Sequence, residues 1–286
     1  MTNDTISVAF AGNEGIFDGM LISTLSLISH NSCPVDIYIL TMTLTEKGDK
    51  FTAVTEKQRA FLEKACKRVN EKSRVILLDT TELYRKHLLD CPNGDSYTPY
   101  ALIRLFLDEF DVPSKILYLD TDTVINGDIS ELWQTDISDC EFAGVLDHYG
   151  KIFMGIKCLC RYVNSGVLLM NMDKIRETAL FKKCIRQLAK RKVFLPDQTV
   201  LNRYVKKKRL LLRKFNEQKH FDRDDTIIQH FSMTIIWHPF FPFFYTKNIK
   251  PWHTDRVRSE LTHKYDDILD KYILLKKELE SEDSNE

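Results

Sequence analysis

The chain has little glycine and proline and carries no net charge. Only 10 glycines and 8 prolines occur among 286 residues, whereas hydrophobic residues make up 43%. This composition excludes a collagenous, low-complexity or disordered chain and predicts a globular protein. Because 41 Lys and Arg residues are balanced by 41 Asp and Glu residues, the chain also lacks the global basic field that drives nonspecific binding to nucleic acid. We therefore expect no nucleic-acid partner and chemistry confined to local sites.

Signals for export, for a membrane span and for a cysteine framework are missing as well. Residues 1–7 are polar, unlike a signal peptide. No apolar run reaches the roughly 20 residues of a membrane span, and the longest candidate, 235–245, is broken by two prolines and a histidine. The seven cysteines include no C-x-x-C pair, and Cys158 and Cys160 are expected to be packing or loop residues. These absences predict a cytoplasmic protein with reduced cysteines.

Short apolar runs alternate with helix-like stretches along the chain, with no linker and no internal repeat. This alternation predicts an α/β fold with a mostly parallel sheet flanked by helices. In such sheets ligands bind beyond the carboxyl ends of the strands, which points to the loops after Ala11 and Leu119. Thr55 and Gln58 have the spacing of a capping box, and the acidic stretch 278–286 is expected to fray. The expected strands are 6–11, 35–40, 75–78, 115–119, 142–146, 163–170 and 210–212, and the expected helices are 16–28, 55–69, 81–89, 100–110, 173–192, 196–204 and a charged segment from about 255.

Asp120 and Asp122 follow the apolar segment 116–119 directly. Residues i and i+2 of an extended chain point to the same side, so the two carboxylates form an oxygen-rich site suited to a divalent ion that bridges phosphates. An EF-hand loop is excluded because its required glycine would be Ile125. A phosphatase of the haloacid-dehalogenase type stays an alternative: its nucleophile also lies two residues before an acid, and Asp224–Asp225 could supply its later acidic pair.

A third interpretation rests on an ordered set of segments between about residues 6 and 253. In that order the set resembles the retaining glycosyltransferases of family 8, the group of bacterial galactosyl- and glucosyltransferases and glycogenin. The segments are 8–11 (VAFA), 100–105 with Arg104, 117–122 (LYLDTD), 132–133 (LW), 162–171 (YVNSGVLLMN), 196–202 (PDQTVLN), 215–216 (FN), 230–232 (HFS) and 250–252 (KPW).

The resemblance implies a GT-A type, Rossmann-like fold as a single domain with a C-terminal helical extension. The glycosyltransferase domain would cover 1–253, with a nucleotide-sugar part at about 6–125 and an acceptor part at about 126–253. Residues 254–286 would form the helical extension and acidic tail.

The resemblance also implies a metal and diphosphate site. Asp120, Asp122 and His230 would hold Mn²⁺, because two carboxylates with one imidazole suit this ion better than Mg²⁺, which is the alternative ion. Lys250 would contact the β-phosphate, and Arg104 would place a second cation near the leaving group. A structural histidine and surface cations are the alternative interpretations of these positions.

Further residues would surround the UDP-sugar. Ala11, Thr121 and Asn164 match donor-binding positions, and Asn13 stands where the family usually has an aspartate that grips uracil. An amide can still hydrogen-bond a pyrimidine edge. Because of this departure, a domain that binds nucleotide sugars without turnover stays an alternative.

The transferred sugar would meet a second group of residues. Asp147 and Asp197 would bind its hydroxyls, and Gln198 would lie near the anomeric carbon. An amide is a poor nucleophile, so we favour a front-side route through an oxocarbenium-like ion pair over double displacement. The alternative for Asp197 is a structural acid in the first turn of a helix.

The acceptor is indicated only broadly. The stretch 233–249 is longer than the compact family version, and its aromatic run 237–245 would line the acceptor site, contact a membrane or partner, or complete the core. The basic segment 203–214 could meet anionic lipid or be a solvated face. The resemblance thus implies a Mn²⁺-dependent hexosyltransferase that uses UDP-glucose or UDP-galactose in making bacterial cell-surface polysaccharide. Its acceptor would be a glycan, lipid-linked or protein-linked. The enzyme itself could bind peripherally to the inner face of the membrane.

Overall fold

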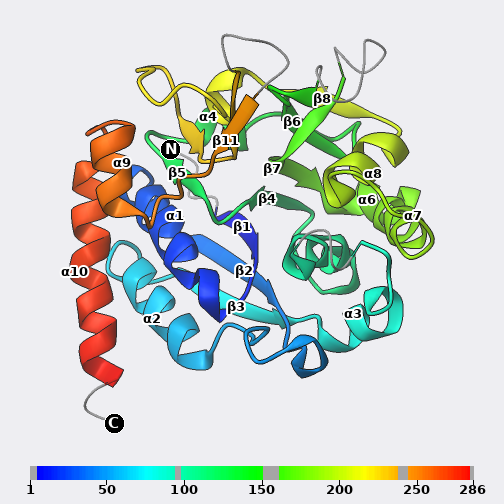
Figure 1. Cartoon of the computed structure of the whole chain (residues 1–286), viewed down its shortest axis with the longest axis horizontal. Helices are drawn as coiled ribbons and strands as arrows, with labels where there is room; N and C mark the ends of the chain where they lie inside the picture. Colours follow the sequence, from blue (N-terminus) through cyan, green and yellow to red (C-terminus); the bar gives the residue numbers. More distant parts are fainter. Residues whose placement is uncertain (1–4, 94–97, 151–160, 238–243, 284–286) are drawn as a thin grey trace.

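The computed structural model describes residues 5–93, 98–150, 161–237 and 244–283. Its centre is a seven-stranded sheet with the order β3-β2-β1-β4-β7-β6-β8 (Figure 1). All neighbouring strands run parallel except that β7 is antiparallel to both β4 and β6. The predicted mostly parallel α/β sheet is therefore confirmed. The strands are β1 (Ile6–Ala11), β2 (Val35–Thr41), β3 (Arg74–Asp79), β4 (Lys115–Leu119), β6 (Phe142–Leu146), β7 (Val163–Asn171) and β8 (Lys208–Leu210).

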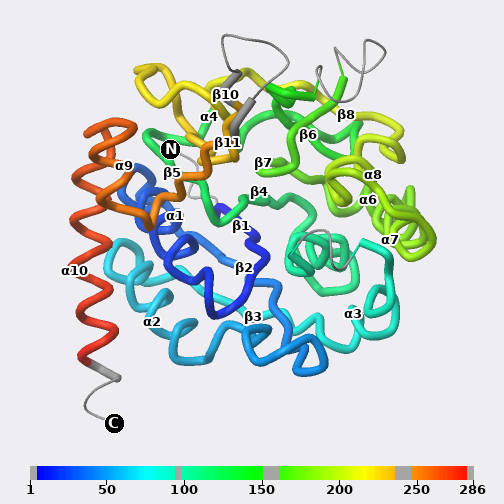
Figure 2. The backbone as a smooth tube through the Cα atoms, in the orientation of Figure 1, coloured from blue at the N-terminus to red at the C-terminus, as the bar shows by residue number. Residues whose placement is uncertain are grey.

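Both faces of this sheet are buried, as the continuous apolar runs of β1 and β4 require. Side chains alternate across β1: Val8 and Phe10 belong to one apolar cluster, Ala9 and Ala11 to the other. Helices cover the sheet in two layers, and Figure 2 traces the backbone from one layer to the other. The first layer contains α1 (Phe17–His30), α2 (Glu56–Lys67) and α10 (Asp266–Asp283). The second contains α3 (Thr81–Leu88), η4 (Ile103–Glu109), α6 (Met172–Thr178), α7 (Leu180–Leu188) and α8 (Pro196–Tyr204).

Short elements lie above the carboxyl ends of β1 and β4. The strand β5 (Thr123–Ile125) pairs antiparallel with β9 (Ile228–His230), which sets His230 opposite Thr123. A second hairpin joins β10 (Thr234–Trp237) to β11 (Phe244–Lys247). The remaining elements are α4 (Ser130–Trp133), α9 (Thr254–Glu260), η1 (Glu14–Ile16), η2 (Thr45–Lys47), η3 (Pro99–Ala101) and η6 (Arg213–Phe215).

Several local signals are confirmed by the structure. Thr55 and Gln58 form the reciprocal capping box at the start of α2, and Pro196 occupies the first turn of α8. Five cysteines, at 33, 66, 91, 140 and 184, are free thiols, whereas Cys158 and Cys160 lie outside the described residues. Among the described residues, no helix combines the length and apolarity needed to cross a bilayer.

Other predicted elements differ. The stretch 173–192 is two helices, because Ala179 adopts a left-handed conformation at φ 51° and ends α6. The expected helix at 100–110 is 3-10 rather than α-helical. The tail does not fray from residue 278, since α10 continues to Asp283 and Glu278 pairs with Arg68 at 2.5 Å. This ion pair with the residue that follows α2, and a second one between Glu278 and Lys64 of α2, hold the last turns of α10 against the first layer.

Candidate active site

A cleft of about 530 Å³ opens beyond the carboxyl ends of β1 and β4, where the sequence predicts ligand binding. Of the twelve residues singled out from the sequence, Asn13 is the one not among the lining; its amide instead donates to the Lys50 carbonyl at 3.1 Å. The roles of all twelve stay predictions. The eleven that line the cleft are Ala11, Arg104, Asp120, Thr121, Asp122, Asp147, Asn164, Asp197, Gln198, His230 and Lys250.

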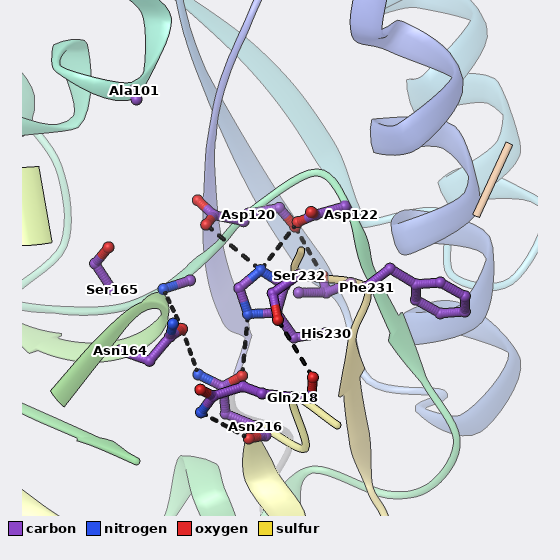
Figure 3. Close-up of polar contacts among 12 residues, drawn as sticks. Ala101, Asp120, Asp122, Asn164, Ser165, Asn216, Gln218, His230, Phe231 and Ser232 are labelled. Atoms are coloured by element: carbon purple, nitrogen blue, oxygen red, sulfur yellow. Dashed lines mark hydrogen bonds and ion pairs between the residues drawn. The ribbon is translucent and has the colours of Figure 1, made fainter. Parts of the chain in front are cut away.

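Asp120, Asp122 and His230 meet at one end of this cleft (Figure 3). One ligand atom from each lies within 4.8 Å of the other two. His230 Nε2 is 3.2 Å from Asp122 Oδ1 and 3.8 Å from Asp120 Oδ2. The two aspartates leave the end of β4, and the pairing of β9 with β5 delivers the histidine. Two carboxylates and an imidazole around one small volume can hold a divalent cation.

The approach of these groups depends on Gly166 in β7. A Cβ at this position would lie 2.2 Å from Cε1 of His230 and 2.9 Å from Oδ2 of Asp120. The Gly166 carbonyl also accepts the Asp120 backbone N–H at 2.7 Å. Glycine is needed here for close approach and not for an unusual φ, a role that sequence reasoning did not assign to it.

Lys250 neutralises one edge of the acidic cluster. Its Nζ donates to Asp122 Oδ2 at 2.5 Å and to the Phe231 carbonyl at 3.0 Å. Burial by itself would raise the pKa of Asp122, but His230 and Lys250 outweigh burial and hold it well below its usual range. Burial likewise opposes charge on His230, yet Asp122 and Asp120 raise its pKa overall. Asp122 is therefore held in its ionised form, which is the form that can bind a cation.

Arg104 connects the acidic cluster to the rest of the cleft. It is 3% exposed, and its guanidinium donates to Asp120 Oδ1 and to the Ser165 carbonyl, each at 2.8 Å. It also lies 3.5 Å from Asp197 Oδ2 and 4.2 Å from the centre of the Tyr118 ring. A buried arginine between two carboxylates orients both of them. Contact between Arg104 and a phosphate stays a prediction.

The other end of the cleft holds Asp147, Asp197 and Gln198. Gln198 Nε2 donates to Asp147 Oδ2 at 2.9 Å, and its Oε1 accepts the Ser165 backbone N–H at 3.0 Å. Asp197 Oδ2 accepts from the Ser165 hydroxyl at 3.0 Å. These acids and amides are held by buried partners and line a concave surface, an arrangement suited to the hydroxyls of a sugar.

A strained residue precedes this group in the chain. Leu195 has φ 46° and ψ 70°, a left-handed conformation that is uncommon for leucine. It lines the cleft and directly precedes Pro196, the first residue of α8. The strain turns the chain so that Asp197 and Gln198 stand in the first helical turn, and such strain is concentrated at functional sites.

The structure bears on the phosphatase interpretation but not on the expected role of the aromatic run. Asp224 and Asp225 are exposed and do not line the cleft, and Asp225 is paired with Arg213. The later acidic pair of a phosphatase is therefore not brought to Asp120 and Asp122. The aromatic run 237–245 has its centre, 238–243, outside the described residues, so its proposed contact with an acceptor stays a prediction. Met233 and Ile235, just before it, line the cleft.

Comparison with known proteins supports the order of the motifs. The model of Glycosyl transferase family 8 matches residues 7–256. The chain is 26% identical over 278 residues to the lipopolysaccharide 1,2-glucosyltransferase of Escherichia coli K12, covering 88% of this chain and 74% of that protein. It is 24% identical over 226 residues, 75% of its length, to a Haemophilus influenzae protein that carries a glycosyltransferase name. The chain spans 64% of the length of that protein.

A solved structure extends the comparison to the fold. The galactosyltransferase LgtC, in complex with donor and acceptor sugar analogues, superposes with a TM-score of 0.64 at 18% identity. The alignment covers 94% of this chain and 95% of that one. At this identity the likeness shows the GT-A fold.

Proposed function

The chain belongs to glycosyl transferase family 8, and on this premise we propose that it transfers a hexose, glucose or galactose, from a UDP-sugar to an acceptor glycan with retention of anomeric configuration. The observation that carries the proposal is the cleft itself. It joins the Asp120, Asp122 and His230 cluster to the Asp147 and Gln198 group in one concave surface. A cation site beside a hydroxyl-binding site is what a nucleoside diphosphate sugar requires.

The acidic cluster fits Mn²⁺. Asp120 and Asp122 supply carboxylate oxygens and His230 supplies an imidazole nitrogen, all within 4.8 Å. This mixed donor set suits Mn²⁺, whereas Mg²⁺, the alternative ion, prefers oxygen ligands. When bound, the ion would offset negative charge on the diphosphate.

The protein's own side chains would complete the donor site. The ammonium of Lys250, now on Asp122, would donate to the diphosphate as charge develops on the leaving group. Ala11 and Thr121 also line the cleft and would contact the nucleotide. Asn13, whose amide donates to the Lys50 carbonyl, would have to turn from this partner to reach the uracil edge.

The sugar would lie against Asp147, Asn164, Asp197 and Gln198. In a front-side transfer the bond from the anomeric carbon to the phosphate oxygen breaks, and the acceptor hydroxyl oxygen forms its bond on the same face. The departing phosphate oxygen takes the acceptor proton, so UDP and the glycoside are the products. Gln198 would stabilise positive charge on the sugar. Asp147 would bind a sugar hydroxyl beside it, since it lies 2.9 Å from the Gln198 amide.

The test is turnover of the donor alone and then with acceptors. UDP-glucose or UDP-galactose with Mn²⁺ should give slow release of sugar and UDP, and Asp122→Asn should abolish it. Phosphate release from simple phosphomonoesters, lost in Asp120→Asn, would instead support the phosphatase. Thermal stabilisation by UDP and Mn²⁺ without turnover on any acceptor would support a binding domain.

We also propose that the protein is cytoplasmic and binds anionic lipid at the inner face of the membrane, where it would meet a lipid-linked acceptor. Thirteen of the 41 Lys and Arg residues fall within 180–214, against a single carboxylate, Asp197. In contrast, α10 holds seven acidic residues and three lysines. Figure 1 shows α10 on one side of the molecule and α7, α8 and β8 on the opposite side. The segment 180–214 therefore forms a basic side of the molecule, which complements an anionic surface.

Exposed apolar groups accompany this basic side. Phe194 is 60% exposed and Leu212 63% exposed, and Phe194 also lines the cleft. Lys190, Arg191 and Lys192, which Val193 separates from Phe194, are exposed and form none of the ion pairs found among the described residues. Cations beside exposed apolar side chains are typical of surfaces that bind the membrane interface.

A further inference from the structure

The buried side-chain amides of Asn164 and Asn216 form a chain of hydrogen bonds that ends on His230 (Figure 3). Asn164 Nδ2 donates to Asp147 Oδ2 at 3.0 Å. Asn164 Oδ1 accepts the backbone N–H of Gly166 at 3.0 Å. Because a peptide N–H can only donate, the contact with Gly166 fixes which way the Asn164 amide points.

The orientation of Asn164 then determines that of Asn216. Asn216 is fully buried, and its Nδ2 donates to Asn164 Oδ1 at 2.9 Å. Its Oδ1 is left facing Nδ1 of His230 at 3.2 Å. An amide oxygen only accepts, so the imidazole must carry a proton on Nδ1 for this contact to be a hydrogen bond.

We propose that Asn216 is a positioning residue that holds neutral His230 in the Nδ1–H tautomer. Nε2 then directs its lone pair toward the space shared by the carboxylates of Asp120 and Asp122, 3.8 and 3.2 Å away. This deepens the proposed metal site and rests on it. Without Asn216 the carboxylates would draw the ring proton to Nε2, where it would block the nitrogen as a metal ligand. Because the same amides end on Asp147, the chain also ties the metal end of the cleft to its sugar end.

The test compares Asn216→Leu, Asn216→Asp and a matched control, Asn93→Leu. Asn93 is also fully buried and makes three hydrogen bonds, to the carbonyls of Leu188 and Arg191 and from the N–H of Val193. It does not line the cleft. Leucine at 216 removes the acceptor for Nδ1–H, whereas aspartate keeps it.

Two measurements separate this proposal from the proposed activity. Long-range ¹H–¹⁵N spectra of the metal-free protein, recorded where the ring is neutral and assigned with His230→Ala, report the tautomer. Electron paramagnetic resonance of free Mn²⁺ reports metal affinity without any turnover. We expect Nδ1–H in the wild type and in Asn216→Asp, and Nε2–H in Asn216→Leu. We expect Mn²⁺ to bind about 10- to 100-fold more weakly to Asn216→Leu, and as in the wild type to Asn93→Leu.

Either of two results would overturn the proposal. One is an Nε2–H ring in the metal-free wild type. The other is an Asn216→Leu protein that binds Mn²⁺ as tightly as Asn93→Leu does. The tautomer is read in the wild type itself, so a variant that does not fold leaves this test intact. Failure of the protein to turn over any UDP-sugar would count against the proposed function and leave the tautomer assignment standing.

Discussion

Gly166 lies so close to His230 that an added Cβ would stand 2.2 Å from Cε1 of the ring. The same Cβ would be 2.9 Å from Asp120 Oδ2, so one position controls the spacing of two proposed metal ligands. Both neighbours are anchored: Asp120 accepts from Arg104, and His230 is held by the pairing of β9 with β5. A side chain at 166 must therefore displace part of the cluster.

The first prediction follows for Gly166→Ala. We expect Mn²⁺ affinity to fall by at least tenfold and stability to fall by about 1–3 kcal/mol, the usual cost of overpacking a tight site. Urea unfolding and Mn²⁺ titration measure the two effects. Gly127→Ala is the control, since the nearest atom to its Cβ would be Ile227 Cγ1 at 3.9 Å. Unchanged Mn²⁺ affinity in Gly166→Ala would contradict the assignment of the ligands.

Replacing Lys250 should change the affinities for Mn²⁺ and for UDP in opposite directions. In Lys250→Met the cation 2.5 Å from Asp122 Oδ2 is lost, so Mn²⁺ should bind more tightly to the substrate-free protein. UDP should bind about 10- to 100-fold more weakly, because a charge-assisted hydrogen bond contributes roughly 1.5–3 kcal/mol. Calorimetric titration with UDP at saturating Mn²⁺ measures the second effect.

Lys247→Met is the control for that change. Lys247 is similarly exposed, but its Nζ pairs with Glu260 at 3.1 Å and does not reach the cleft. If Lys250→Met left UDP affinity equal to that of Lys247→Met, Lys250 would not be a phosphate ligand.

The parts of the site that the sequence predicted are those encoded by local spacing. Asp120 and Asp122 follow a buried strand, and their separation alone places them on one side. Pro196 likewise indicates the start of α8, which carries Asp197 and Gln198. His230 was identified only through resemblance to the family, because its partner Asp122 is more than one hundred residues away.

The parts that were missed depend on contacts distant in sequence. In the sequence Asn216 is an ordinary polar residue, and only the structure shows its hydrogen bonds to Asn164 and His230. Gly166 gives no signal of its own, since its role comes from side chains of two other elements. The break at Ala179 was missed for a related reason: no glycine or proline stands there to mark it.

Asp108 offers a pH-dependent test of the fold away from the cleft. Burial, aided by Glu109, raises the pKa of its carboxyl to about 6, and its Oδ1 is buried without a hydrogen-bond partner among the described residues. Between about pH 4 and pH 6 the folded chain therefore binds more protons at this group than the unfolded chain, so its contribution to stability is lost as pH rises.

Asp108→Asn should remove the loss of stability that ionisation of this carboxyl causes as pH rises. Relative to the wild type, we expect the variant to gain about 2–3 kcal/mol of unfolding free energy between pH 4 and pH 7. Urea unfolding of both proteins across this range gives the difference, in which the titrations of all other groups cancel. A difference that does not change with pH would show that Asp108 ionises normally in the folded protein.

The basic side of the molecule predicts salt-sensitive binding to anionic vesicles. Each Lys or Arg near an anionic surface contributes about 1 kcal/mol, so reversing Lys190, Arg191 and Lys192 to Glu should weaken binding at least roughly 100-fold. Co-sedimentation with vesicles of phosphatidylglycerol and phosphatidylcholine measures this, with phosphatidylcholine alone as the neutral comparison. Salt should weaken the wild-type interaction, because exposed charges are screened.

The matched control reverses Lys72, Lys271 and Lys277, which are exposed and lie outside the basic segment. Net charge changes equally in the two variants, so a difference between them reports the location of the charges and not their number. If both variants lost binding equally, net charge and not a basic face would govern adsorption. Retention on a polyanionic glycan without sedimentation on vesicles would identify the basic side as a site for an acidic acceptor polymer. Phe194 lies on this side and also lines the cleft. If the side faces lipid, Phe194→Ser should weaken vesicle binding. Binding to a polyanion should be unchanged, because an exposed aromatic ring adds little to the affinity for a polyanion.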